Sequence, residues 1–535
     1  MTERRPIIII PGIFGSRLVN QHNEIIWPCS SKYTAFKIPS NMLRLWGRTT
    51  ADGLFENFSD DIITAIPGLS GCESLIPNLE EFKCFYDIST SLQAQGYREN
   101  IDLFAFTYDF RHSLLRLSEQ FETFTANLKL KSLPILITHS IGSLIPRFLQ
   151  HKSANWSKIF ASQIAIAGTF DGANGGGLMA VVDGYDLQFS WLRHCTRGFW
   201  CNSGMQLGLL QSKNINSGVQ QYVYLKIQET SSEKTQDLNI VQQFWENCRI
   251  IKWSEKSTIM GIFKLVLENP KAVNKNAGFW AMRFKKLLGR KVYIPDTAFE
   301  ENECYESLSC CFNQEKKFFA NQQYPLKEQI SDVQQVIDLD SKYVRYAFWA
   351  QREEFVPTQQ EIEYFQTRKL EDAPQDNIQR LVYTKYWLDT NNKLPQHTET
   401  RDLRDLYHNI SEEGTLEALV FPQNDIQHEA HQNLRDQEID FQSFKFASIC
   451  GSGIQTSSHA IFNAEIQNEY ELHGLKHQCL YSEGDGTVLL SSQISDSVPD
   501  SHVIERKIFS GIGHVDLMKN QACVAKILEY VKLMQ

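Results

Sequence analysis

Residues 133–143 read LPILITHSIGS, and this stretch decides the fold. Its apolar run, Ile135–Ile137, predicts a buried strand, and the residues from Leu144 to Gln150 predict a helix directly after the turn. A serine between such a strand and helix, here Ser140, stands at the tip of a tight turn with its hydroxyl exposed and its backbone strained. We interpret Ser140 as a candidate nucleophile, and the alternative is an ordinary strand–helix corner that contains a serine.

Small residues two positions before and after such a serine allow the strand and the helix to pack closely. Gly142 meets this requirement, whereas Thr138 stands where glycine is usual and its branched side chain needs more room.

The composition is that of a globular protein with a large core. The chain has 535 residues, 42% of them hydrophobic and 12% aromatic, and a formal net charge of −10. This length suits two to four domains of about 150 residues, or one domain with a large insertion. The negative charge argues against a general nucleic-acid binder. We expect a cytoplasmic protein, because no secretory signal opens the chain and no apolar stretch approaches the ~20 residues of a membrane span.

The twelve cysteines are scattered and show no paired CxxC spacing. The sequence therefore predicts neither a zinc site nor an iron–sulfur cluster, and the chemistry that we propose for Ser140 requires no cofactor. In the expected compartment the thiols are reduced.

Strand and helix patterns alternate at both ends of the chain, which predicts an α/β fold with a mostly parallel central sheet. Predicted strands are Pro6–Ile10, Ile101–Tyr108, Ile135–Ile137, Gln163–Ala167, Phe444–Cys450 and Val503–Phe509, and predicted helices are 80–95, Leu115–Leu128, Leu144–Gln150 and Lys519–Met534.

The middle of the chain differs, because it is richer in Gln, Asn and charged residues and its apolar segments have helical spacing. We expect a core formed by residues 1–175 and 441–535, split by a long, mainly helical cap insertion at 176–440. Within the first part, the irregular segment 27–75 is a candidate lid or membrane-contact segment.

A serine nucleophile requires a base and a group that orients the base. In α/β-hydrolases these partners follow the serine in the order Asp, His. Asp485 lies in a Gly-Asp-Gly turn, and His514 follows the strand that ends near Phe509, so both have the required order. Asp516 and Glu483 are less suitable acids, and we interpret His139 as a packing residue on the other side of its strand.

The tetrahedral intermediate of such a reaction needs two backbone N–H groups around its oxyanion. The amide of Ile141, directly after the serine, is one candidate donor. Ile13 is the other, because it lies in the glycine loop that follows the first strand. A plain glycine turn is the alternative interpretation of that loop.

Seven segments of the chain carry a recognisable set of motifs: Pro6–Leu18, Gln95–Tyr97, Tyr108–Arg111, Thr138–Gly142, Tyr481–Val488, Gly511–His514 and, less completely, Ala167–Gly172. Together they resemble the lecithin:cholesterol acyltransferase family, a group that includes a lysosomal phospholipase and the phospholipid:diacylglycerol acyltransferases. The likeness covers about residues 5–175 and 444–535. Phe110 replaces a tryptophan that is usual in the family, and Thr138 replaces glycine or alanine.

The resemblance implies the α/β-hydrolase fold, a triad of Ser140, Asp485 and His514, and oxyanion donors at Ile13 and Ile141. It also implies that the acyl donor is a glycerophospholipid ester and that water or an alcohol accepts the acyl group. The family's secreted members carry a disulfide after the first loop. Trp27-Pro28-Cys29 matches its first half, but Cys72 falls too late, so we predict no such bond.

Two apolar segments of the insertion suit a lipid substrate. Residues 252–291 contain ten basic residues and only two acidic ones, Glu255 and Glu268, together with several aromatic side chains. This composition suits docking on an anionic membrane surface. The alternative, which we slightly favour, is an ordinary amphipathic helix pair packed on the core with solvated lysines. The cluster at 189–210 fits either an acyl pocket or the core of the cap.

These observations predict a serine acyl hydrolase or O-acyltransferase that acts on lipid esters. The alternatives are an esterase for small soluble esters and an inactive hydrolase-fold scaffold that binds a partner. The sequence indicates neither the acyl acceptor nor the oligomeric state.

Overall fold

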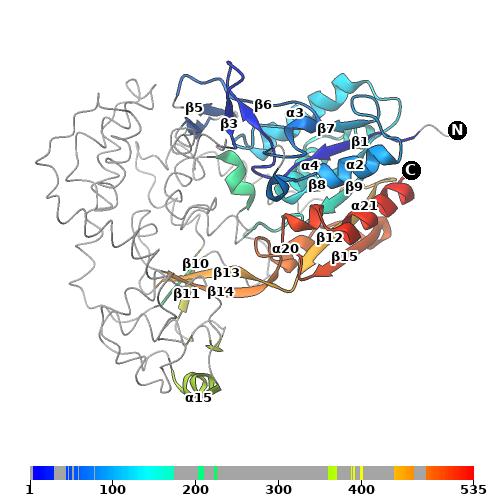
Figure 1. Ribbon diagram of the computed structural model, residues 1–535. Helices are drawn as coiled ribbons and strands as arrows, with labels where there is room; N and C mark the ends of the chain where they lie inside the picture. Colours follow the sequence, from blue (N-terminus) through cyan, green and yellow to red (C-terminus); the bar gives the residue numbers. More distant parts are fainter. Residues whose placement is uncertain are drawn as a thin grey trace, which may run out of the picture.

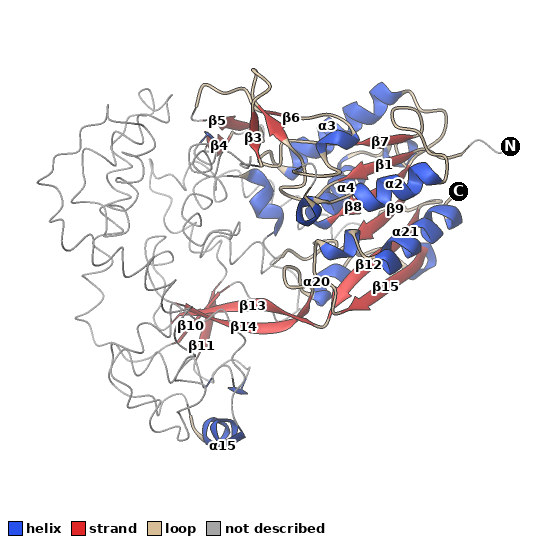
Figure 2. Cartoon of the chain, viewed as in Figure 1, coloured by secondary structure: helices blue, strands red, loops and turns tan. Residues whose placement is uncertain are grey.

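The structure is a computed structural model, and its central element is a six-stranded parallel sheet (Figures 1 and 2). The strand order is β15 (Val503–Ser510), β12 (Lys445–Ser452), β9 (Ser162–Ile166), β8 (Ile135–His139), β1 (Ile7–Ile10) and β7 (Leu103–Ala105). The described residues are 4–28, 44–45, 47–50, 53–57, 59–76, 79–173, 203–209, 222–225, 359–369, 387, 390–391, 398–401, 439–462 and 477–535.

Every pair of neighbouring strands in this sheet is parallel, which confirms the α/β fold with a mostly parallel sheet. The inner strands are apolar because helices cover both faces of the sheet, so alternate side chains enter two different cores. In β1, Ile8 and Ile10 lie in one core and Ile7 and Ile9 in the other, and all four side chains are fully buried.

Four helices form the two outer layers. On one face, α3 (Leu114–Leu128) and α4 (Leu144–Lys152) pack on the sheet and on each other. On the other face lie α2 (Tyr86–Ala94) and α21 (Gln521–Leu533), which also contact each other (Figure 1). These helices confirm the four that the periodicity predicts.

Two small sheets accompany the first part of the core, and three of their five strands fall within the segment 27–75 that the sequence predicts to be irregular. One joins β3 (Ile25–Trp27), β2 (Leu18–Val19) and β6 (Thr64–Ala65), and the other pairs β4 (Gly47–Thr49) with β5 (Phe55–Asn57). The role of residues 27–75 as a lid or membrane contact stays a prediction.

A long hairpin extends away from the carboxyl end of β12 (Figure 1). Its strands, β13 (Ile454–Phe462) and β14 (His477–Gly484), are antiparallel. Together with β10 (Tyr222–Leu225) and β11 (Thr398–Arg401) they form a four-stranded sheet. This sheet therefore joins strands of the predicted insertion to strands of the second core segment.

Few other parts of the insertion are described. They include a 3-10 helix at Gly204–Leu209 and α15 (Gln359–Thr367). Two apolar segments of the insertion have helical spacing in the sequence, Ile240–Trp245 and Val333–Trp349. Both of them, and the basic stretch 252–291, lie outside the described residues. The domain boundaries and the mainly helical character of 176–440 therefore stay predictions. Among the helices that the structure describes, none combines the length and the apolar character needed to span a membrane.

The segment after β7 contains a buried ion pair. Arg111 donates from Nε and Nη2 to Asp109 at 2.8 and 2.5 Å, and both side chains are at most 5% exposed. Burial opposes ionisation of Asp109, but the charge and hydrogen bonds of Arg111 outweigh it and hold the pKa of this carboxyl below its usual value. Nη1 of Arg111 also donates to the carbonyl of Leu45 and to Oδ1 of Asn57, which ties this segment to the β4–β5 sheet.

We expect Arg111→Met to lower the free energy of unfolding by about 3–5 kcal/mol, because it leaves the Asp109 carboxylate buried without its partner. The matched control is Arg116→Met, which removes a half-exposed partner of Glu119 and should cost no more than about 1 kcal/mol. Urea denaturation of the three proteins measures both effects. Equal losses in the two variants would contradict the structural importance of the buried pair.

Candidate active site

Ser140 lies at the turn between β8 and α4, as the sequence predicts. Its φ is +53°, in the left-handed region that costs a non-glycine residue about 1–3 kcal/mol. A short 3-10 turn, Ser140–Ser143, connects the strand to the helix. The N–H of Ile141 lies in the first turn of this helical segment, where no earlier helical carbonyl is available to accept it.

Two glycines allow the loop after β1 to pass directly over this turn. A Cβ on Gly142 would lie 2.3 Å from the carbonyl oxygen of Pro11. A Cβ on Gly12 would lie 2.8 Å from Cβ of Ser140. Both contacts are too short for real atoms, so any larger residue would displace the loop from Ser140.

Thr138 occupies the position where glycine is usual, and polar partners accommodate its side chain. Its hydroxyl lies 2.9 Å from Oγ of Ser143, and it accepts a hydrogen bond from Nε2 of Gln163 at 3.1 Å. Gln163 also donates to the backbone carbonyl of Ser143 at 3.1 Å. The neighbouring strand β9 thus supplies the amide that holds a threonine in this corner.

Asp485 and His514 are hydrogen-bonded to each other although 29 residues separate them. Nδ1 of His514 lies 2.7 Å from Oδ2 of Asp485, and the backbone N–H of His514 donates to the Asp485 carbonyl at 3.0 Å. The other carboxylate oxygen accepts from the backbone N–H groups of Thr487 and Val488 at 3.0 and 2.7 Å. A carboxylate held in this way fixes the imidazole so that Nδ1 carries the proton and Nε2 is free to accept one.

His514 lies beside the turn that carries Ser140. Its ring centroid is 4.7 Å from that of His139, the residue directly before Ser140. Nε2 of His139 is 3.2 Å from the backbone carbonyl of His514, to which it donates when it carries the proton. Among the described residues, no hydrogen bond joins Oγ of Ser140 to the His514 ring. Such bonds are often long without substrate and shorten when substrate binds.

The sequence predicts only a packing role for His139 on the other side of its strand. In the structure, His139 also contacts the proposed base. It contacts the ring and the backbone of His514, and its own ring also meets the edge of Phe85. Burial, and then the nearby charge of His514, hold the pKa of His139 well below the usual value of 6.5. No sequence motif assigns this contact, because it depends on how the 511–514 loop crosses the end of β8.

The two alternative acids point to solvent. Glu483 is exposed on β14, and Asp516 has a side chain that is 69% exposed and 4.0 Å from Lys519. Asp485, in contrast, has a fully buried side chain in contact with the histidine. Of the three, Asp485 alone has the contacts that orient an imidazole.

Ile13 lies in the loop after β1, residues Pro11–Ser16, which we call the oxyanion loop after the role that the sequence predicts for it. The segment after β7 holds this loop. The hydroxyl of Tyr108 donates to the Pro11 carbonyl at 2.5 Å, and the Tyr108 N–H donates to Oγ of Ser16 at 3.2 Å. Next to Ile13, Phe14 packs against Trp27 and Phe110 with ring centroids 4.8 and 5.1 Å away. The Phe110 ring thus provides an aromatic contact where the family usually has tryptophan.

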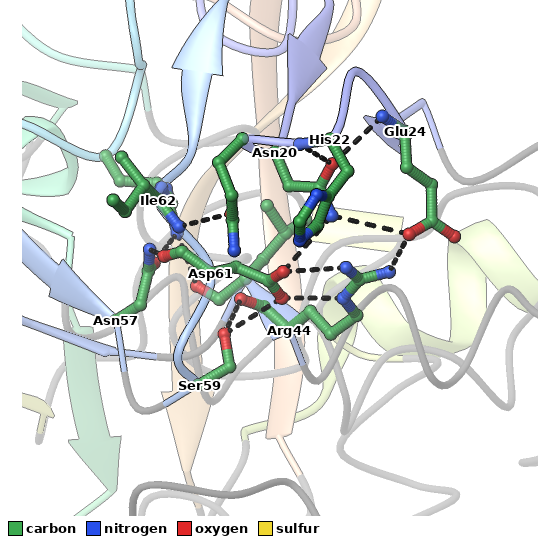
Figure 3. Close-up of polar contacts among 11 residues, drawn as sticks. Asn20, His22, Glu24, Arg44, Asn57, Ser59, Asp61 and Ile62 are labelled. Carbon is green, nitrogen blue, oxygen red and sulfur yellow. Dashed lines mark hydrogen bonds and ion pairs between the residues drawn. The ribbon is translucent and has the colours of Figure 1, made fainter.

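Polar contacts centred on Asp61 connect residues of the small sheets and their loops (Figure 3). Asn57, which accepts from Arg111, donates to the carbonyl of Asp61 at 2.6 Å. Arg44 binds both carboxylate oxygens of Asp61 at 2.7 Å and contacts Glu24 at 3.0 Å. The hydrogen bonds from Arg44 lower the pKa of Asp61. These contacts fix the position of the small sheets relative to the oxyanion loop.

Part of the apolar cluster at 189–210 is described, and it contacts the same site. Met205 and Leu209 are buried in the core that contains Ile141. A Cβ on Gly208 would be 3.3 Å from Cδ1 of Ile141. The choice between an acyl pocket and cap core stays open.

Two sequence predictions concern a disulfide and a metal site. Cys72 is a buried free thiol, and Cys29 lies outside the described residues, so the expectation about their pairing is not tested. In the part of the chain that the structure describes, no group of three His, Cys, Asp or Glu side chains could hold a metal ion.

The strand order, the turn at Ser140 and the position of the oxyanion loop define the α/β-hydrolase fold. Residues 61–197 match the lecithin:cholesterol acyltransferase family. This match confirms the resemblance that the motifs predict for this part of the chain.

Two curated relatives are from Arabidopsis thaliana. Phospholipase A(1) LCAT3 is 30% identical over 199 residues, which cover 33% of this chain and 43% of the relative. Lecithin-cholesterol acyltransferase-like 4 is 26% identical over 209 residues, which cover 35% and 38%. The match thus spans less than half the length of each relative. Among solved structures, the crystal structure of the Tle4-Tli4 complex matches 100% of this chain and 99% of that chain, with a TM-score of 0.42 and 12% identity.

The low pKa of His139 predicts a pH dependence of stability. The unfolded chain protonates this residue at about pH 6.5, whereas the folded protein does so only well below that value. Stability should therefore fall as the pH drops below about 6.5, by up to about 1.4 kcal/mol per pH unit from this group, until the folded pKa is reached. We expect the free energy of unfolding of His139→Gln to fall less steeply with decreasing pH than that of the parent protein. Urea denaturation between pH 5 and 7.5 measures this.

The control is His22→Gln at an exposed position, which should keep the pH dependence of the parent protein. Parallel stability curves for the parent and His139→Gln would show that this prediction is wrong.

Proposed function

We propose that this protein is a serine acyl hydrolase or O-acyltransferase that acts on glycerophospholipid or related lipid esters. The observation that carries the proposal is the hydrogen-bonded Asp485–His514 pair beside the strained turn at Ser140. The match to the lecithin:cholesterol acyltransferase family supports the lipid ester as substrate. The names of the two plant relatives support the same class, one as a phospholipase A(1) and one as an acyltransferase-like protein.

In this mechanism, Oγ of Ser140 attacks the ester carbonyl while Nε2 of His514 takes the serine proton. Asp485 keeps the proton on Nδ1 and stabilises the imidazolium that forms. The N–H groups of Ile13 and Ile141 donate to the oxyanion. His514 then returns the proton to the leaving lysolipid alcohol, and an acyl group stays on Ser140.

The second half repeats these steps with a new nucleophile. His514 takes the proton from water or an alcohol, whose oxygen attacks the acyl carbonyl. When the intermediate collapses, Ser140 recovers its proton and a fatty acid or a new ester leaves. Water as acceptor makes the protein a phospholipase, and an alcohol makes it an acyltransferase. No metal or cofactor takes part in either half.

The proposal includes the place where the protein meets its substrate, which is a membrane surface. The basic and aromatic stretch 252–291 would bring the site to an anionic membrane surface. A cytoplasmic, peripherally membrane-bound protein is consistent with this composition, and it stays a prediction.

A fluorophosphonate probe tests the nucleophile. We expect the probe to label the wild-type protein at Ser140 and expect Ser140→Ala to lose labelling and at least ~10³-fold in ester hydrolysis. Ser118→Ala, at an equally buried serine on α3, should keep both. If the wild type resists the probe, the inactive scaffold becomes the preferred interpretation.

Product analysis tests the substrate. We expect vesicles of mixed anionic and zwitterionic phospholipids to yield lysophospholipid, and an added long-chain alcohol to become acylated if the protein is a transferase. The rate should rise sharply when a short-chain phospholipid passes its aggregation threshold. Hydrolysis of monomeric esters without that rise would favour the soluble-ester esterase.

A further inference from the structure

Gln493 connects the end of a core strand to the loop that carries Asp485. It lies on α20 (Leu490–Ile494), the short helix that follows this loop, and its side chain is fully buried. Its Oε1 accepts from the N–H of Gly451 at 2.8 Å, and its Nε2 donates to the Gly451 and Val488 carbonyls, both at 3.1 Å. One amide therefore satisfies three buried backbone groups, and their donor and acceptor types fix its orientation.

Both ends of this connection lie at the proposed triad. Gly451 is near the carboxyl end of β12, and a Cβ there would lie 2.7 Å from Cβ of Asp485 and 3.1 Å from the carbonyl of Ile512. The loop that carries Asp485 and the loop that leads to His514 therefore both pack against the backbone of Gly451. A movement of this backbone would shift Asp485 and His514 relative to each other.

Val488 is the second contact point. Its N–H donates to Oδ1 of Asp485, and its carbonyl accepts from the Asp485 N–H at 3.2 Å as well as from Gln493. This pair of bonds closes the turn that aims Oδ2 of Asp485 at His514. Without the amide, the Val488 carbonyl would keep a single weak partner and the turn could open.

We propose that Gln493 is a positioning residue that holds Asp485 in the orientation needed to bind Nδ1 of His514. It acts through the backbones of Gly451 and Val488 and does not touch the reacting atoms. This inference rests on the proposed function, because it assigns a role within the same triad.

The neighbouring residue provides a matched control. Ser492 is on the same helix and is equally buried, and its hydroxyl also makes two backbone hydrogen bonds. These bonds go to Asp171 and Gly172 in the loop after β9 instead of the acid loop. Ser492→Ala should therefore destabilise the protein without changing how Asp485 faces His514.

The experiment measures fluorophosphonate labelling rates in a double-mutant cycle. Gln493→Met, which conserves the volume, should lower the rate about tenfold in the wild-type background. In an Asp485→Asn background, where the carboxylate is already lost, it should change the rate by less than about twofold. Gln493→Glu keeps an acceptor for the Gly451 N–H but replaces the amide that donates to the Gly451 and Val488 carbonyls with a carboxyl oxygen, and it should behave in the same way. Ser492→Ala should label at the wild-type rate, and urea denaturation confirms that each variant is folded.

The acid limb of the labelling rate against pH gives a second readout. The Asp485 carboxylate faces the ring that takes the serine proton, so the acid limb should shift in Gln493→Met and stay in place in Ser492→Ala. Equal losses of rate in both backgrounds, or labelling of Gln493→Met at the wild-type rate, would overturn the inference and leave the proposed function standing. A wild type that does not label would instead remove the proposed function, and this inference with it.

Discussion

The backbone of Ser140 is held in a conformation that its own side chain disfavours, and the site depends on this constraint. The φ of +53° turns the chain sharply from β8 into α4. It persists because the loop after β1 packs on the turn through Gly12 and Gly142, where no side chain fits. The same contact places the loop that contains Ile13 over the turn, so a single packing arrangement positions both the proposed nucleophile and the proposed oxyanion donor.

The rest of the site is formed by segments that are far from Ser140 in the sequence and lie close to its turn in the fold. Tyr108 fixes the oxyanion loop, and the buried Asp109–Arg111 pair connects that segment to the small sheets through Asn57. On the opposite side, the β13–β14 hairpin returns the chain to the end of β12 one residue before Asp485. Between the two parts of the core, β9 pairs directly with β12, so the large insertion separates them in sequence without displacing them in space.

Much of the core could be predicted, because its strands are continuous apolar runs and its motifs follow a fixed order. The β13–β14 hairpin could not, since its strands mix polar and apolar residues and pair with strands far away in the sequence. The contact between His139 and His514 cannot be predicted for a similar reason, because it depends on the path of the 511–514 loop past the end of β8. Thr138 looked unfavourable from its size alone, and only the neighbouring Gln163 on β9 shows how the corner accommodates it.

The most direct measurement identifies the residue that carries the acyl group during turnover. The protein is mixed with a nitrophenyl ester, quenched in acid within the first turnover, digested and analysed by mass spectrometry. If Ser140 is the nucleophile, we expect a burst of nitrophenol and an acyl mass on the peptide that contains Ser140. Turnover with the acyl mass on any other residue, or without an acylated peptide at any quench time, would contradict this role of Ser140.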